Sequence, residues 1–297
     1  MFLTNFLPDR SVTKIQIPDF FAQQPQDLQL AAQAALAAGE IIKDGYQRSH
    51  QIDAKGVGDL VSQVDFDADR VATDVLSKAY PDTTIISEEL NPDVGDAQTD
   101  AWVIDPLDGT TAYLMKGGPH FSSVLIAKRE AGETTLGIVY FPLTDEWFYA
   151  VRGQGAFNDG QPLKLPQQDW NLSECWVEMN QYGNCTYETP FFAAARNALR
   201  SDAGAQIVTS TFPHAGIAMR ILQQNSGLAI AIHDNNPANL KQGPWDIAAN
   251  QVIFEEAGGV FCNPTGGRTC PFAAEPILIA PNKTLADQLC SLVAATT

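Results

Sequence analysis

The chain has 297 residues, enough for about two domains, and its 45% apolar content is ordinary for a folded protein and too high for a disordered one. Its 18 lysine and arginine residues against 35 aspartate and glutamate residues give a net charge of −17 at pH 7. That charge argues against a nucleic-acid polymer or an anionic membrane surface as partner, because both need a basic protein surface, but it leaves room for a small anion held through a metal ion.

In the first half of the chain, helix signals come first and strand signals follow. Residues 1–25, interrupted by three prolines, are expected to form an irregular arm. Apolar residues at helical spacing predict helices over 27–46 and 67–80, separated by a loop or hairpin over 52–62. Short apolar runs then predict strands over 84–87, 101–105, 121–128, 136–141 and 146–151, followed by glycine-rich turns over 153–160. This order is typical of an α+β domain.

In the second half, helix and strand signals alternate. The expected helices span 190–199, 215–224, 245–256 and 283–294, and the expected strands span 206–208, 228–232 and 277–280. Such alternation indicates α/β layering. We therefore predict an arm (1–25), an α+β domain (26–165) and an α/β domain (166–297), with the boundary in a polar stretch flanked by prolines.

The cysteines and the N-terminal segment bear on the compartment. The five cysteines form an odd set with no C-x-x-C spacing, so neither a zinc ribbon nor a dithiol redox motif is readable. Reduced thiols in the cytosol are the simplest interpretation. Asp9 and Arg10 stand where the apolar run of a signal peptide would continue, and no stretch approaches the roughly 18 apolar residues of a membrane span. We expect a cytoplasmic protein with no membrane partner.

Carboxylates stand at the ends of apolar strands, where structural needs alone would not place them. Asp105 follows the run 101–104, and the proline after it is expected to end the strand. A tight turn would aim Asp105 and Asp108 into one space, and Gly109 would let the backbone approach a ligand closely. A helix beginning at Thr110 would add free N–H groups that attract an anion. Acids for a cation beside N–H groups for an anion are what a metal–phosphate site requires.

Further acids repeat this placement. Glu88 and Glu89 end another apolar strand, and adjacent carboxylates repel unless a cation or proton compensates. Asp246 opens a predicted helix, and Asp65 stands just before one. Each has an ordinary alternative: a helix cap for Asp65 or Asp246, a solvated loop for the glutamates, and a turn for Asp108. Considered together, they form a set of hard oxygen ligands that suits Mg²⁺ rather than zinc.

At these motifs the sequence resembles the inositol monophosphatase family of Mg²⁺-dependent, lithium-sensitive phosphatases. The matching segments, in consistent order over residues 30–290, are 61–65 (V-S-Q-V-D), 87–89 (S-E-E), 102–110 (W-V-I-D-P-L-D-G-T), 153–160 (G-Q-G-A-F-N-D-G) and 245–246 (W-D). The resemblance implies a two-domain layered αβαβα sandwich with the site between the domains. It also implies a homodimer.

The resemblance further implies two to three Mg²⁺ ions. One would be bound by Glu88, Asp105 and the backbone carbonyl of Leu107, and a second by Asp105, Asp108 and Asp246. A third, weaker ion is attributed in some members of the family to the surroundings of Glu88.

The resemblance also assigns catalytic and substrate contacts. Thr110 and Asp65 would orient the attacking water, with Glu88 in contact with it, while the backbone of Gly109 and Thr110 would hold the phosphate. By the same resemblance, the side chains of Asp108 and Asp246 would border the substrate.

The sequence departs from the family pattern where substrate is expected. Ser87 replaces a usual glycine, and Ala112-Tyr113 replaces asparagine-phenylalanine. His214 falls in a segment that usually contacts substrate through small residues; it is either a helix-capping or surface histidine, or a contact to a second anionic or hydroxyl group. The polar loop 233–244 lacks the usual acidic contact. These changes bear on the substrate and leave the metal chemistry intact.

The expected activity is Mg²⁺-dependent hydrolysis of a small phosphate monoester, with inositol monophosphate as the default substrate. The alternatives within this chemistry are 3′-phosphoadenosine 5′-phosphate, histidinol phosphate and a sugar phosphate. A non-catalytic protein that binds metal or phosphate is a second class, against which the retained Thr110, Asp65 and Glu88 argue. A glycosidase with paired carboxylates is a third, but it does not explain an acidic turn facing a helix start.

Overall fold

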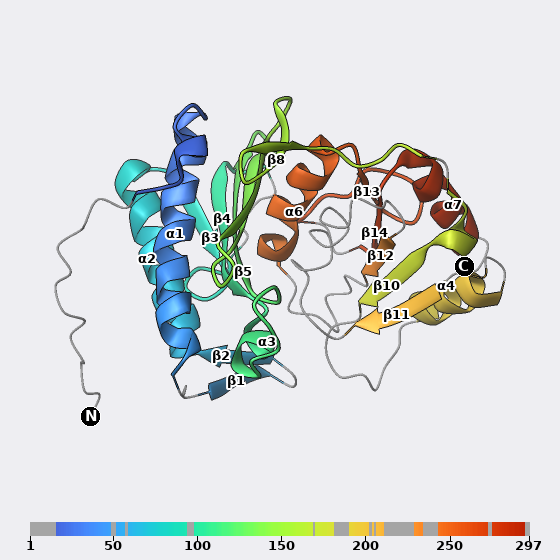
Figure 1. Ribbon diagram of the computed structural model, residues 1–297, viewed down its shortest axis with the longest axis horizontal. Helices are drawn as coiled ribbons and strands as arrows, with labels where there is room; N and C mark the ends of the chain where they lie inside the picture. The colour runs from blue at the N-terminus through green and yellow to red at the C-terminus, as the bar shows by residue number, and fades with distance from the viewer. Residues whose placement is uncertain are drawn as a thin grey trace.

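The computed structural model describes residues 16–48, 52–56, 59–93, 98–168, 170–180, 190–201, 204, 206–210, 229–233, 243–272 and 275–294. These residues form five layers (Figure 1). In order across the molecule, the layers are α1 (Gln26–Tyr46) with α2 (Gln63–Ala79), a seven-stranded sheet, α6 (Pro244–Glu256), a five-stranded sheet, and α4 (Pro190–Ser201) with α7 (Lys283–Ala294). The expected αβαβα sandwich is confirmed.

The first layer covers the outer face of the seven-stranded sheet. The buried side of α1 is mostly alanine and glycine, which lets the helix approach the sheet closely; a Cβ on Gly39 would lie 2.4 Å from the ring of Tyr140. The hairpin of β1 (Ile52–Gly56) and β2 (Asp59–Ser62) leads into α2. Helix α2 begins four residues before the predicted position, because the Ser62 hydroxyl accepts from the Val64 N–H and caps it. Asp65 therefore lies inside the helix, not before it.

The seven-stranded sheet runs β3-β4-β5-β6-β7-β8-β9, with β3 and β4 parallel and every other neighbouring pair antiparallel. Its strands are β3 (Thr84–Ser87), β4 (Ala101–Asp108), β5 (Ser123–Glu130), β6 (Glu133–Phe141), β7 (Glu146–Val151), β8 (Gly155–Asn158) and β9 (Gln161–Leu163). Strand β4 does not stop at the proline after Asp105, as the sequence predicted, but continues to Asp108. The short helix α3 (Thr110–Leu114) then begins at the predicted residue.

Helix α6 lies between the two sheets and is buried on all sides. Its apolar side chains share one core with Val103 and Leu125 of the first sheet and with Phe261 and Ile277 of the second. A Cβ on Gly137 of β6 would meet the backbone of α6 at 2.8 Å, so glycine permits this close packing. Because α6 belongs to 166–297 by sequence yet packs on the first sheet, the two halves are joined by a common core, and the domain limits stay a prediction.

The second sheet has the order β11-β10-β12-β14-β13. Its strands are β10 (Trp176–Asn180), β11 (Gln206–Ser210), β12 (Ala229–His233), β13 (Val260–Cys262) and β14 (Ile277–Ala280). Strand β10 is parallel to β11 and β12, whereas β14 is antiparallel to both of its neighbours. A separate hydrophobic core joins β10 and β14 to α4 and α7, with the one-turn helix η2 (Leu172–Glu174) at its edge.

The described part of the N-terminal arm is ordered against the first sheet. Residues 19–21 form the 3-10 helix η1 (Asp19–Phe21), which the sequence did not predict. The fully buried Phe21 packs edge-on against Trp147 at 5.3 Å between ring centroids and tilted against Tyr149 at 4.8 Å. This segment therefore belongs to the core of the first sheet.

Two further observations concern the described residues alone. None of their helices combines the length and apolar character needed to cross a membrane. Cys175, Cys262, Cys270 and Cys290 are all free thiols.

Three predictions concern residues outside the described part of the chain. These are His214, the helix over 215–224 and residues 234–242 of the polar loop.

Candidate metal and phosphate site

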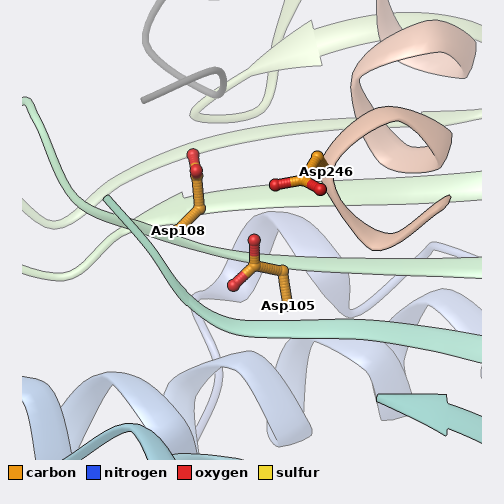
Figure 2. A group of neighbouring side chains, drawn as sticks. All are labelled: Asp105, Asp108 and Asp246. Carbon is orange, nitrogen blue, oxygen red and sulfur yellow. The ribbon is translucent and has the colours of Figure 1, made fainter. Parts of the chain in front are cut away.

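Three aspartates converge between the first sheet and α6. The side chains of Asp105, Asp108 and Asp246 point toward one another (Figure 2), and each offers a carboxylate oxygen within 4.8 Å of those of the other two. All three are buried, with at most 7% of their surface exposed. Two come from β4 and the third from the first turn of α6, so residues about 140 positions apart in the sequence meet in one site.

An irregularity in β4 brings its two aspartates to the same face. Residues three apart on a regular strand point to opposite faces of a sheet. Between Asp105, which pairs with Leu125, and Asp108, which pairs with Ser123, β4 carries one residue more than β5. This extra residue turns the side chain of Leu107 toward the core under α1 and α2 and returns Asp108 to the α6 side. The proline that was expected to end the strand thus lies within the irregular segment of a longer one.

Asp246 is held by the start of α6. It is the third residue of the helix, and its carboxylate Oδ2 accepts a hydrogen bond from the Gly243 N–H at 2.8 Å. Gly243 must lack a side chain, because a Cβ there would lie 2.2 Å from the Trp245 ring. Asn250 donates through Nδ2 to the Asp246 backbone carbonyl at 2.8 Å. Asp246 is not the N-cap residue itself, but it accepts from the N-cap Gly243 and also belongs to the group of three aspartates.

The electrostatics of the cluster favour a bound cation. Burial raises the pKa of Asp246 well above its ordinary value, and the negative charges of Glu88 and Asp108 raise it further. Buried carboxylates this close cannot all ionise unless a proton or cation compensates. A compact set of carboxylate oxygens is also the donor set that Mg²⁺ prefers. The residues present therefore fit a divalent hard cation.

Beside the cluster, Thr110 and Asp65 form the predicted pair. Thr110 Oγ1 lies 2.7 Å from Asp65 Oδ1 and 3.1 Å from the Leu107 carbonyl oxygen. The other oxygen of the buried Asp65 accepts from the backbone N–H and the hydroxyl of Ser62, at 2.9 and 2.7 Å. Gly109 precedes Thr110 with φ 89°, a left-handed conformation that glycine adopts without strain. Two sequence motifs 45 residues apart are thus joined by one hydrogen bond.

Glu88 lies near Asp246 but outside the group of carboxylates that approach within 4.8 Å of one another. It follows the end of β3 directly, is partly buried, and donates its backbone N–H to the Ile104 carbonyl of β4 at 3.2 Å. Its charge is among the causes that raise the pKa of Asp246, so the two carboxylates are close enough to interact. The structure therefore places Glu88, Asp105, Asp108, Asp246 and the Thr110–Asp65 pair in one region.

The sequence analysis did not single out Asp69. This residue is fully buried in α2 and its carboxylate accepts hydrogen bonds from the turn that follows Glu88. A sequence signal was available: Asp69 is four residues after Asp65, which places both acids on the same face of a helix. An acid on the side of a helix that faces the core is unusual unless it has partners.

The layers define a mixed α+β protein with two sheets and a buried group of three acids, between the first sheet and α6, that could hold a metal ion. The sequence model of the inositol monophosphatase family matches residues 24–297. The chain is 32% identical over 256 residues to Nus factor SuhB of Pasteurella multocida (strain Pm70), which covers 86% of this chain and 91% of that one. It is 31% identical over 251 residues to inositol monophosphatase 3 of Solanum lycopersicum, covering 81% and 87%.

Solved structures of the family have the same fold as this chain. The crystal structure of the extragenic suppressor protein SuhB from Bartonella henselae superposes with a TM-score of 0.76 at 25% identity, over 91% of this chain and 98% of that one. The chain belongs to the inositol monophosphatase family, as its motifs indicated. The relatives carry two kinds of name, inositol monophosphatase and Nus factor.

Proposed function

We propose that the protein hydrolyses a small phosphate monoester with Mg²⁺ as cofactor. The observation that carries this proposal is the convergence of Asp105, Asp108 and Asp246 in a buried cluster beside the Thr110–Asp65 hydrogen bond. A metal store would need only the acids. The Thr110 hydroxyl, which a fourth buried acid, Asp65, holds beside the cluster, is what we expect where a water molecule has to be oriented.

The cluster supplies the metal ligands. Asp105, Asp108 and Asp246 would hold one Mg²⁺, and Glu88, Asp105 and the carbonyl of Leu107 a second, with a third near Glu88 in a two-to-three-ion arrangement. When bound, Mg²⁺ supplies positive charge to the phosphoryl oxygens and lowers the pKa of a water ligand. The backbone at Gly109 and Thr110 would hold the phosphate, with Asp108, Asp246 and His214 bordering the rest of the substrate.

The hydrogen bonding of Thr110 determines how it can orient water. A hydroxyl has one proton, and Thr110 Oγ1 has two acceptors within reach, Asp65 Oδ1 and the Leu107 carbonyl. Its proton is therefore committed, and Oγ1 is left to accept a hydrogen bond from the attacking water. Asp65 stays in place because Ser62 holds its other oxygen. The pair thereby directs the lone pair of the water away from Oγ1 and toward the phosphorus, with Glu88 in contact with the same water.

Inositol monophosphate is the default substrate. One relative is named inositol monophosphatase 3, and one structural neighbour with a TM-score of 0.74 is an IMPase/NADP phosphatase complexed with NADP and Ca²⁺. The latter is 20% identical to this chain, so it supports the fold alone. The alternatives remain 3′-phosphoadenosine 5′-phosphate, histidinol phosphate and a sugar phosphate. We place the enzyme, as a homodimer, in the cytoplasm.

Phosphate release from a substrate panel tests the proposal. Each candidate ester is incubated with Mg²⁺ and with EDTA, using the wild-type chain and Asp105→Asn, which keeps the side-chain shape and removes one charge of the cluster. We expect Mg²⁺-dependent release from at least one ester and none from the variant. Equal rates with Mg²⁺ and EDTA would refute the role of the metal.

A non-catalytic binding function is the second candidate, because several relatives are named Nus factor SuhB. It predicts Mg²⁺ binding without phosphate release from any ester of the panel. The Thr110–Asp65 hydrogen bond favours catalysis, because binding alone does not require an oriented hydroxyl. The panel therefore distinguishes the two candidates directly.

A further inference from the structure

One buried carboxylate near the site is not used by the proposed mechanism. Asp69 lies on α2, has none of its surface exposed, and directs Oδ2 at two consecutive backbone amides, those of Glu89 at 3.0 Å and Leu90 at 3.1 Å. Its Oδ1 accepts from the Thr73 hydroxyl at 3.0 Å, and the Ser87 side chain also donates to it. Four donors thus converge on one carboxylate and offset part of the cost of burying it, while burial still raises the pKa of Asp69.

These bonds fix the chain on the C-terminal side of Glu88. The N-terminal side is already fixed, because the Glu88 N–H bonds to Ile104 of the neighbouring strand. Asp69 holds the next two peptide groups. The backbone of Glu88 is therefore held on both sides, and the direction of its Cα–Cβ bond relative to β4 is set before any ligand binds.

The turn does not need Asp69 in order to close. Its base is closed by two backbone bonds between Ser87 and Asn91, at 3.0 and 3.3 Å. The turn is also near solvent, since Leu90 is 44% exposed. Loss of the Asp69 carboxylate would therefore leave the turn formed and release only the amides inside it. This separates a positioning role from a general structural one.

We propose that Asp69 is a positioning residue for Glu88: it presets the glutamate for metal binding by holding the peptide groups that follow it. The inference deepens the proposed function and rests on it. Two residues one turn apart on α2 would then position the site: Asp65 accepts from Thr110, and Asp69 accepts from the turn that follows Glu88. Residues that orient metal ligands typically contribute about 10–100-fold to metal affinity or activity.

The test compares two substitutions of Asp69 with two controls. Asp69→Ala removes the acceptor, whereas Asp69→Asn keeps one oxygen for the two amides and can donate to the Thr73 hydroxyl. Thr73→Val removes a bond to the other oxygen, Oδ1. Asp159→Asn neutralises a carboxylate that accepts a hydrogen bond from the Trp147 backbone N–H. Asp159 lies near the edge of the seven-stranded sheet that is opposite to β3. The controls separate loss of the contact to the amides from loss of charge or stability.

Two readouts are used. Mg²⁺ binding is measured by calorimetry, and amide hydrogen exchange at Glu89 and Leu90 is measured in EDTA. We expect Asp69→Ala to weaken Mg²⁺ binding about 10–100-fold and to speed exchange at both amides. Asp69→Asn should recover most of the affinity, and Thr73→Val and Asp159→Asn should leave both readouts near wild type.

The outcomes distinguish this inference from the proposed function. Wild-type Mg²⁺ affinity and unchanged exchange in Asp69→Ala would overturn the role of Asp69 while leaving the phosphatase proposal standing. Equal losses of affinity in Asp69→Ala and Asp159→Asn would also overturn it, since a general loss of stability would then explain both. Failure of the wild type to bind Mg²⁺ would refute the proposed function itself; the exchange measurement in EDTA would still show whether Asp69 holds the turn.

Discussion

Replacing Asp246 by asparagine should make the metal-free protein more stable and reduce its response to Mg²⁺. The three aspartates have carboxylate oxygens within 4.8 Å of one another. Two unit charges at that distance repel by about 3.5 kcal/mol at an effective dielectric constant of about 20. Asp246 takes part in two of the three pairs, so its charge accounts for about 7 kcal/mol of repulsion when all three are ionised.

Protonation can limit this cost, because a proton removes the charge of Asp246, whose pKa is raised. At pH 8, protonating an aspartate of ordinary pKa near 3.9 costs about 5.5 kcal/mol. If the repulsion exceeded this cost, Asp246 would take up a proton, so about 5.5 kcal/mol is the largest destabilisation that its charge can cause. Relaxation of the side chains lowers it further, so we expect Asp246→Asn to raise the free energy of unfolding in EDTA by about 2–4 kcal/mol. Asparagine keeps an oxygen that can accept from Gly243, so the start of α6 is preserved.

Urea unfolding at pH 8, in EDTA and in Mg²⁺, measures both effects. The wild type should gain stability on addition of Mg²⁺, and Asp246→Asn should gain clearly less, because only the ion proposed at Glu88, Asp105 and the Leu107 carbonyl remains. Asp159→Asn, outside the cluster, should respond to Mg²⁺ as the wild type does. A variant less stable than the wild type in EDTA, or one that keeps the full Mg²⁺ response, would refute the reasoning from repulsion.

Three further outcomes are expected. Thr110→Val removes the hydroxyl that donates a hydrogen bond to Asp65, and it should lower kcat about 10²–10⁴-fold without changing the Mg²⁺ affinity. A kcat equal to that of the wild type in steady-state kinetics would contradict this expectation. The pKa of Asp246 is raised, so the metal-free fold gains stability from a bound proton that is lost as pH rises through the raised pKa. The increase in Tm caused by Mg²⁺ should therefore be larger at pH 8 than at pH 5.5, and an increase independent of pH would argue against proton displacement. Phe21→Ala should cost about 3–5 kcal/mol in urea unfolding, because the buried ring contacts Trp147 and Tyr149; a change below about 1 kcal/mol would mean that residues 16–25 do not dock in solution.

Much of the fold could be predicted from local sequence because the period of apolar residues reports which face of an element is buried. Strand β14 and helix α7 have the predicted limits, and α3 begins at the predicted Thr110. The prediction was wrong where a side-chain contact changes a boundary. Ser62 starts α2 early through its cap, and the proline after Asp105 sits in the irregular part of β4 instead of ending it. Neither effect shows in apolar periodicity.

The sequence by itself determined which acids are present and which family the chain belongs to, because the motifs around Asp105 and Asp246 are short, ordered and specific. It did not determine how those acids face one another. That depended on the extra residue in β4, which returns Asp108 to the face of Asp105, and on the packing of α6 between two sheets, which brings in Asp246.

The spacing of Asp65 and Asp69 placed both acids on one face of a helix, but only the tertiary structure showed the partners of Asp69, which are backbone amides 20 and 21 residues away. The physical reason is common to these cases. Local sequence sets the preferences of each segment, whereas distances between charged groups depend on register and layer packing, and these are decided by contacts between distant parts of the chain.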